Sequence, residues 1–490
     1  MPKFEIKHRK SGAVIFEGKA NSLKELVQSV VISGTDTSLS QLVVSRLGLK
    51  KKTKVRLYGA DLHGADLSEI DLTGADLSGA DLSECNLAGS CLKKAILARC
   101  SLSKADLSRT TLSETDFSEA DLSRANLRKA QVDTANFSDA LFSGADLSGT
   151  RLTKANLARA NFSGVKLTSS DLSRAQLSGI NFTNADLSWA ILSKANIERA
   201  DLSSANLERA DLSDARLIGS NLSRANLSEA NLQGANLAGV ILAHAVLTDA
   251  NLNGSKLTNA NLLEATLHGA KLARSDCSGS DMTRADLTDA DLEGANLSGA
   301  RLNEANMVGS SMVGINLTNS QLGKAILSKA SLSSANLAGA QMEEADLRSA
   351  SLEGADLSGA NLTKANMGEA NLQKSKLVSA DLSGANLGGA VAVNADMTRV
   401  NALGANFSAA NMQNSCLDEA NLSGSNLAGA SFSGVKMTGT SLAGADLSGT
   451  DFSWAFINGA DFTGVKIAGT NMKGAKLTDV KGIKLKKSPT

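Results

Sequence analysis

The sequence contains few residues that would interrupt a regular backbone. Among 490 residues there are two prolines, Pro2 and Pro489, and aromatic residues make up 3% of the chain. Because proline fixes φ and removes a backbone donor, nothing between these two positions forces a break in regular structure. A chain of this length normally divides into several domains, but its composition is uniform, which favours one extended array of repeats.

Paired cysteines and long apolar runs are also missing. The five cysteines form no CxxC pair and no disulfide-like framework, which favours a reducing compartment. No apolar segment follows the first residues MPKFEIKHRK, and no stretch approaches the roughly 18 apolar residues of a membrane span. We therefore expect a cytoplasmic protein, with secretion by a signal-independent route as the alternative.

The usual combinations of catalytic residues are absent as well. The four histidines are scattered, and the sequence has no HExxH, no zinc-type Cys/His spacing, no phosphate-binding loop and no nucleophile elbow. Catalysis needs several different functional groups gathered in a concave site. The sequence therefore predicts a non-enzymatic protein with no catalytic residues, no metal site and no cofactor.

Charge is balanced overall but unevenly placed. Residues 1–54 carry 11 basic and 4 acidic residues, a net of +7, and residues 481–490 carry +4. Since 50 basic residues offset 50 acidic ones in the whole chain, residues 55–480 total −11. This balance argues against direct nucleic-acid binding, which depends on clustered Lys and Arg.

What the sequence has instead is a five-residue repeat. From Leu57 to Leu477, 85 positions in one register form the centres of units, and 60 of them are Leu, nine Phe and nine Met. Two residues before each centre stands Ala in 57 of 85 cases, and never a charged residue. The unit reads A-[D/N]-L-[S/T]-x.

This period excludes both an ordinary helix and a flat strand. Five helical steps rotate each Leu about 140° from the last, and an odd spacing in a strand sends successive Leu residues to opposite faces. The chain must therefore turn once per unit, with the centre and the residue two before it pointing inward. Four units, or 20 residues, would close a coil. Four pairs of phenylalanines lie 20 residues apart, three pairs 25 apart and none 15 apart.

The A-[D/N]-L-[S/T]-x array resembles the pentapeptide-repeat family. The resemblance implies an all-β fold, a right-handed quadrilateral parallel β-helix, and 85 units at four per coil give about 21 coils. We expect a pentapeptide-repeat β-helix at residues 55–480 and a basic C-terminal tail at residues 481–490. Relatives that inhibit gyrase often dimerise through their C-terminal ends, so the resemblance also implies a homodimer through that end.

Residues 1–54 lack the repeat and predict a small ββα module. Phe4 and Ile6 alternate with polar residues, the turn-like sequence RKSG follows, and the sequence AVIFEG suits a second strand. A capping box at residues 22–25 then opens a helical pattern. We expect this α+β module to cap the first coil, with a partner-binding domain as the alternative.

Large apolar residues at outward positions are candidate partner contacts. They are Trp189 with Ile191, Trp454 with Phe456, and Tyr58. Exposed aromatic residues often anchor a partner, although scattered exposed apolar groups are normal on proteins. One further irregularity is the loss of two large centres, at Ala392 and Ala402, which predicts either local repacking or a bend.

These features leave several functions open. The first is a rod-like scaffold or protein-interaction platform whose protein partner the sequence does not name. The second is a DNA mimic that inhibits or protects a type II topoisomerase such as gyrase, as some relatives do, and the third is a secreted effector of bacterial or phage origin. A mimic needs rows of carboxylates. The most acidic stretch contains Asp61, Asp66, Asp71, Asp76 and Asp81.

Overall fold

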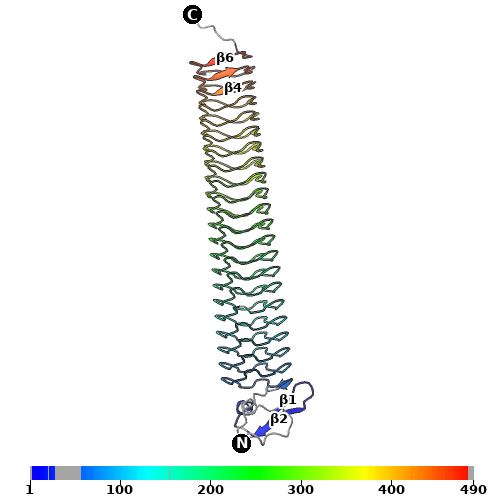
Figure 1. Cartoon of the computed structure of the whole chain (residues 1–490). Coiled ribbons are helices and arrows are strands. Elements are labelled where there is room, and N and C mark those ends of the chain that lie inside the picture. The colour runs from blue at the N-terminus through cyan, green and yellow to red at the C-terminus, as the bar shows by residue number, and fades with distance from the viewer. Residues whose placement is uncertain (1–2, 20, 28–56, 154, 484–490) are drawn as a thin grey trace. The chain divides into compact units, whose positions relative to one another are not determined.

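The computed structural model describes residues 3–19, 21–27, 57–153 and 155–483. The chain forms two compact units, Met1–Val246 and Leu247–Thr490. Within each unit, Figure 1 shows the backbone as a stack of similar coils. Two stretches for which the sequence makes predictions lie outside the described residues. They are residues 28–56, with the rest of the predicted helix and the connector, and residues 484–490 of the basic tail.

The first unit begins with an antiparallel hairpin. Strand β1 (Lys3–His8) pairs with β2 (Val14–Lys19), and Ile6 is buried. Residues 23–27 are helical, and the Ser22 hydroxyl accepts a hydrogen bond from the Glu25 backbone N–H at 3.1 Å. The described part of this module therefore matches the strands, turn and helix start that the sequence predicts.

The hairpin pairs with the first described coil of the repeat array. The free edge of β1 pairs antiparallel with β3 (Ala60–Asp61), the start of the first described coil. The Arg9 backbone N–H also donates to the Gly59 carbonyl at 2.7 Å. The edge of this coil is thus paired with β1.

Each coil within a compact unit contains 20 residues, as shown by parallel bridges between outward-facing residues 20 positions apart. Asp61 pairs with Asp81 in the first unit, and Asp356 pairs with Lys376 in the second. The Leu62 N–H donates to the Asp81 carbonyl and the Asp81 N–H donates to the Ala60 carbonyl, both at 2.8 Å. Four five-residue units therefore make one coil, as the sequence predicts.

The core of each unit consists of the inward positions. All central residues from 57 to 462 are buried, and so is the small residue two before each of them from residue 60 to 460. Phenylalanines 20 residues apart contact each other, with ring centres separated by 4.3 Å for Phe142 and Phe162 and by 5.3 Å for Phe432 and Phe452. The 20-residue spacing of these phenylalanines in the sequence therefore indicated the length of one coil correctly.

Buried hydroxyls at the alanine positions donate to backbone carbonyls. Thr110 donates to the Leu107 carbonyl at 2.6 Å, and Ser375 donates to the Leu372 carbonyl at 2.7 Å. Other hydroxyls donate to a carbonyl of the preceding coil, as Thr115 does to Leu92 at 2.8 Å. Because most of these hydroxyls have a carbonyl acceptor, Ser and Thr fit where most repeats have Ala, although the buried Ser255 hydroxyl has no partner among the described residues.

Each five-residue repeat turns at the residue two positions after its central residue, and this turn residue adopts φ near +60°. Glycine occupies many of these positions, but Arg209 (φ 56°), Trp189 (φ 60°) and Trp454 (φ 60°) adopt the same conformation. For a residue with a side chain, the left-handed region costs roughly 1–2 kcal/mol. Every corner of the coil therefore favours glycine, and a bulky side chain there needs compensation.

Near its C-terminal end the second unit contains three short parallel strands. These are β4 (Lys436–Thr438), β5 (Phe456–Asn458) and β6 (Lys476–Thr478), paired in the order β4-β5-β6. Beyond residue 462 the inward positions are no longer buried. Ile467, a central residue, is 51% exposed, and Met472 and Leu477 are partly exposed.

The two alanine centres lie within a regular ladder. Ala392 and Ala402 are buried, and their N–H groups donate to the carbonyls of Asn411 at 2.7 Å and Asn421 at 2.8 Å. Val400, two residues before Ala402, is also buried. Local repacking and a bend at these positions both stay predictions.

Candidate functional site

The outward surface is mainly polar, and its corners carry ion pairs between successive coils. Arg159 donates two hydrogen bonds to Asp139, and Arg284 contacts Glu304 at 2.9 Å. In each pair the residues are 20 positions apart at the same corner. These pairs are exposed, so each contributes little to stability.

Trp189 and Ile191 form one exposed apolar pair, in the first unit. Their exposed fractions are 53% and 43%. The Arg209 guanidinium lies over the Trp189 ring, 4.8 Å from the ring centre, and donates two 2.8 Å hydrogen bonds to Glu229. These hydrogen bonds lower the pKa of Glu229 and raise that of Arg209. The ring is therefore partly covered by a cation that is already neutralised.

Trp454 and Phe456 form the second pair, in the second unit, and are 62% and 49% exposed. In the sheet β4-β5-β6, Phe456 lies between Lys436 and Lys476. The Lys476 ammonium is 5.1 Å from the centre of the Phe456 ring. The Trp454 ring lies over Gly474, where an added Cβ would come within 2.6 Å of the indole.

Tyr58 lies at the start of the first described coil and is 62% exposed. Its ring centre is 6.2 Å from that of His8, at an angle of 36°. It therefore lies next to the N-terminal hairpin. Its contact with a partner stays a prediction.

The acidic stretch does not gather its five carboxylates on one side. Asp61 and Asp81 pair directly, but Asp66 pairs with Asn86, and the other two pair with Cys91 and Ile96. The five aspartates thus occupy all four sides of the coil. Each carboxylate also accepts a hydrogen bond from the backbone N–H two residues later. These aspartates stabilise turns, and only two of them share a row.

Asp186 makes the same kind of turn and links pH to stability. Burial acts to raise its pKa, but hydrogen bonds from Ser188, Thr168 and Asn206 outweigh burial, so the pKa is lowered. A lowered pKa in the folded state stabilises the fold above the ordinary value of about 4, and this stability is lost as pH falls through and below that value.

We expect Asp186→Asn to reduce the loss of stability on acidification. Asparagine keeps an oxygen that accepts from Ser188 but does not titrate. Urea unfolding at pH 7 and at several values between about pH 5 and pH 3 would show a smaller decrease in the free energy of unfolding for the variant. An equally steep decrease in both proteins would contradict this prediction.

The cysteines divide into buried and partly exposed groups. Burial raises the pKa of Cys85, Cys100 and Cys277 to about 12, so these thiols stay neutral near pH 7. Cys91 and Cys416 are partly exposed, and their sulfurs lie 3.2 Å and 3.3 Å from threonine hydroxyls. The three buried cysteines therefore act as small core residues.

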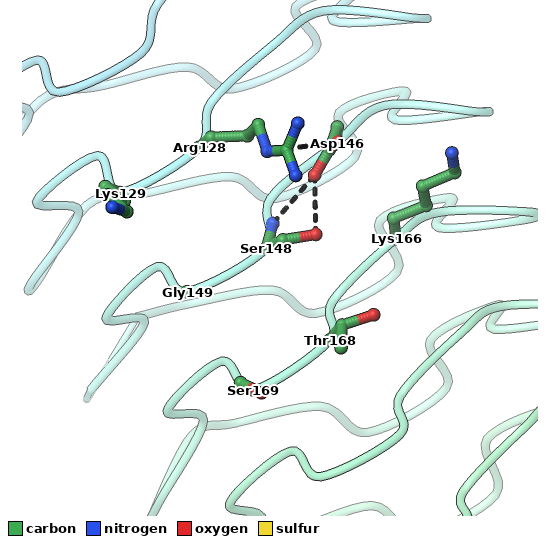
Figure 2. Close-up of a pocket in the computed structure, with 8 residues that line it drawn as sticks. All are labelled: Arg128, Lys129, Asp146, Ser148, Gly149, Lys166, Thr168 and Ser169. Carbon is green, nitrogen blue, oxygen red and sulfur yellow. Dashed lines mark hydrogen bonds and ion pairs between the residues drawn. The ribbon is translucent and has the colours of Figure 1, made fainter.

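An open polar recess lies on the first unit (Figure 2). Asp146 accepts hydrogen bonds from the backbone and hydroxyl of Ser148, and the Arg128 guanidinium lies 3.6 Å from it. Lys129 and Lys166 also line the recess. The recess is therefore positively charged, but it holds no histidine, no cysteine and only one carboxylate.

Nothing in the described residues assembles a metal site. No group of three or more His, Cys, Asp or Glu side chains is placed to hold a metal ion in the segments that the structure describes. Among those segments there is also no helix with the length and apolar character needed to cross a membrane.

Sequence reasoning missed the partners of the aromatic residues. The sequence predicts that Phe456 and Trp454 point outward. Stacking of the coils then places Lys436 and Lys476 beside Phe456, and Gly474 beside Trp454. Once the 20-residue coil is known, the residues 20 positions before and after any outward residue are predictable. The five-residue repeat and the phenylalanine spacing already indicate that coil length, so the sequence contained the signal that could have found these neighbours.

Comparison with known proteins reports the same repeat. The family model of pentapeptide repeats matches segments that together run from residue 60 to residue 481. No curated protein sequence matches the chain.

Solved structures with the same kind of repeat are similar to parts of the chain. HetL, a pentapeptide repeat protein involved in heterocyst differentiation regulation from the cyanobacterium Nostoc sp., is 31% identical over 44% of this chain and 89% of its own, with a TM-score of 0.34. The full-length plasmid-mediated fluoroquinolone resistance protein QnrB1 is 21% identical over 43% of this chain and 91% of its own, with a TM-score of 0.16. A protein of the Arabidopsis thaliana thylakoid lumen is 30% identical over 21% of this chain and 66% of its own, with a TM-score of 0.12.

Proposed function

Because the chain belongs to the pentapeptide-repeat family, we propose that it is a non-enzymatic, rod-like scaffold of about 21 coils that binds a protein partner through its outer sides. The observation that carries this proposal is the pair of exposed apolar sites on a polar surface. Trp189 with Ile191 and Trp454 with Phe456 each combine a tryptophan at a left-handed corner with an apolar residue two positions later. Aromatic residues of this kind anchor protein interfaces.

The scaffold function is tested by affinity capture with the tagged full chain. We expect the wild type to retain a partner from native lysate, and either Trp189→Ala with Ile191→Ala or Trp454→Ala with Phe456→Ala to lose it. Unchanged circular dichroism would show that the variants keep their fold. Identical capture by the wild type and both double variants would contradict the proposal.

We also infer that the N-terminal module caps the array. Pairing of β1 with β3 supports this, because it occupies a strand edge that would otherwise be unpaired. The Arg9 guanidinium supports it further, since it donates to the carbonyls of Gly79 and Ala80 at 3.3 Å.

At the other end we propose a homodimer. Exposure of Ile467, with Met472 and Leu477 partly exposed, supports it, because the same positions are buried in the preceding coils. Analytical ultracentrifugation at micromolar concentration should show a dimer for the wild type and a monomer for Ile467→Asp. A wild-type monomer would contradict the dimer but would leave the scaffold function standing.

The DNA-mimic alternative has weaker support. The carboxylates of Asp61, Asp66, Asp71, Asp76 and Asp81 are spread over four sides, whereas phosphates on one face of DNA form continuous rows. Likeness to QnrB1 at 21% identity concerns the fold alone. A gyrase supercoiling assay discriminates the two functions, and inhibition at submicromolar protein would replace the scaffold proposal with the mimic. Secretion as an effector has no supporting observation.

A further inference from the structure

We propose that the surface around β5 binds a short acidic segment of a partner protein, in which two carboxylates flank an apolar side chain. This surface, the lysine–aromatic patch, consists of Trp454, Phe456, Lys436, Lys473 and Lys476. The proposal rests on the scaffold function and adds the chemistry of the partner that this site would recognise.

The first observation is the order of side chains across the three strands. Phe456 on β5 pairs with Lys436 on β4 on one side and with Lys476 on β6 on the other. Since neighbouring strands lie about 4.8 Å apart, the two lysines begin about 10 Å apart with the phenylalanine between them. The patch therefore places an apolar surface between two cations.

The second observation is the position of Trp454. Its φ of 60° lies in the left-handed region, which costs roughly 1–2 kcal/mol for a residue with a side chain. At 62% exposure the indole recovers little of this cost by burial within the chain. Glycine at position 474 leaves the space into which the ring packs. Many other corner residues with side chains share this φ, so it is the exposure of the indole that favours a role for Trp454 in binding.

The third observation is the local charge. Lys436, Lys473 and Lys476 form no ion pair with any carboxylate that the structure describes. The nearby Asp451 already accepts hydrogen bonds from the Ser453 N–H at 2.9 Å and the Asn471 amide at 2.8 Å. Asp479, three residues after Lys476, is a second carboxylate beside the patch. Three lysines against these two aspartates leave a small local excess of positive charge.

The extent of this charge favours a short ligand. Along the row of Phe456, Lys436 is preceded by Cys416 and then by Asp396, and Asp418 lies one coil before Thr438. A long polyanion such as single-stranded nucleic acid would run from the lysines onto these carboxylates and be repelled. A peptide of a few residues can stay within the last three coils.

The geometry also sets the spacing of acidic residues in the ligand. In an extended peptide only residues two apart point to the same face, so the first acidic residue, the apolar residue and the second acidic residue must occupy positions i, i+2 and i+4. The two acidic residues then stand about 13 Å apart, a span that the long side chains of Lys436 and Lys476 can reach from either side of Phe456. The apolar side chain between the two carboxylates would then pack against Phe456 and Trp454. Each carboxylate would pair with one lysine.

The test uses fluorescence anisotropy with the full chain and a fluorescein-labelled peptide, SGEAFAEGS. Wild type should bind it, and SGQAFAQGS should bind at least about tenfold more weakly. Trp454→Ala with Phe456→Ala, and separately Lys436→Gln with Lys476→Gln, should each weaken binding by at least about tenfold. The matched control, Leu403→Ala, changes another exposed apolar residue of the second unit and should leave binding unchanged. Circular dichroism would check the fold of each variant.

Three results would overturn the proposal. They are the absence of wild-type binding to SGEAFAEGS, equal binding of the glutamate and glutamine peptides, and tighter binding of a labelled oligothymidylate than of the acidic peptide. The scaffold function is judged separately. If Trp454→Ala with Phe456→Ala loses the captured partner while SGEAFAEGS fails to bind, the patch binds a partner of other chemistry.

Discussion

Phe142→Ala is expected to lower the free energy of unfolding by about 3–5 kcal/mol, the usual cost of removing a buried phenylalanine ring. Phe142 is fully buried, and its ring centre lies 4.3 Å from that of Phe162 and 5.1 Å from that of Phe137. Alanine would leave a cavity between these two rings. The effect should be larger than for an isolated central leucine, because two aromatic contacts are lost together.

The neighbouring residue provides the matched control. Leu141 is 45% exposed and directly precedes Phe142, so Leu141→Ala removes apolar atoms from the outside of the same repeat. Urea unfolding should give a large loss for Phe142→Ala and a change within about 0.5 kcal/mol for Leu141→Ala. Similar losses for both would mean that inward and outward positions are assigned wrongly.

The position of the damage is also predictable. In a stacked repeat, each coil contacts only its neighbours, so stability is lost locally. Hydrogen exchange should therefore accelerate most in the coils that contain Phe137, Phe142 and Phe162. Uniform acceleration along the first unit would indicate a single cooperative core.

Ala335→Asp should be equally severe, whereas Ala335→Ser should be nearly neutral. Ala335 is 1% exposed at the small inward position of its unit. Burial raises a carboxyl pKa by as much as about 3–5 units, so an ionised aspartate would cost about 4 kcal/mol or more near pH 7. Serine has a ready acceptor, because Ser375, 40 residues later at the same position of the coil, donates to the carbonyl three residues before it.

Thermal unfolding at two pH values would check this contrast. The aspartate variant should regain part of its stability near pH 4, where its carboxyl group is protonated in the folded state, relative to the wild type at that pH. The serine variant should follow the wild type at both values. A serine variant as unstable as the aspartate variant would contradict the hydrogen-bonding explanation.

The core could be predicted from the sequence because the residue pattern of each five-residue repeat distinguishes its inward positions from its outward ones. The five-residue period excludes a helix and a flat strand, and the spacing of Phe142 and Phe162 indicates the coil length. The N-terminal hairpin was also predictable, since Ile6 alternates with polar residues before a turn. These features depend on neighbours within a few residues, or on one repeated spacing.

The candidate site was only partly predictable. The sequence identifies Trp454 and Phe456 as outward residues, but the lysines beside Phe456 are 20 positions away in both directions. Likewise, Asp61 and Asp66 look like members of one acidic row when read in order, yet they lie on different sides. Side-chain neighbours between coils follow from the coil length, which the sequence only indicated.

The 20-residue coil constrains how such a gene can lengthen. Inserting one pentapeptide before Arg209 would keep every leucine inside, but it would shift all later residues by one side relative to those before. Arg209 would then no longer follow Trp189 at the same corner, whereas duplication of a full coil would preserve the order of the remaining corners. Insertions of 20 residues, or of a multiple of 20, should therefore preserve both the fold and the neighbours of each surface residue. Insertions of another multiple of five should preserve the fold but change those neighbours.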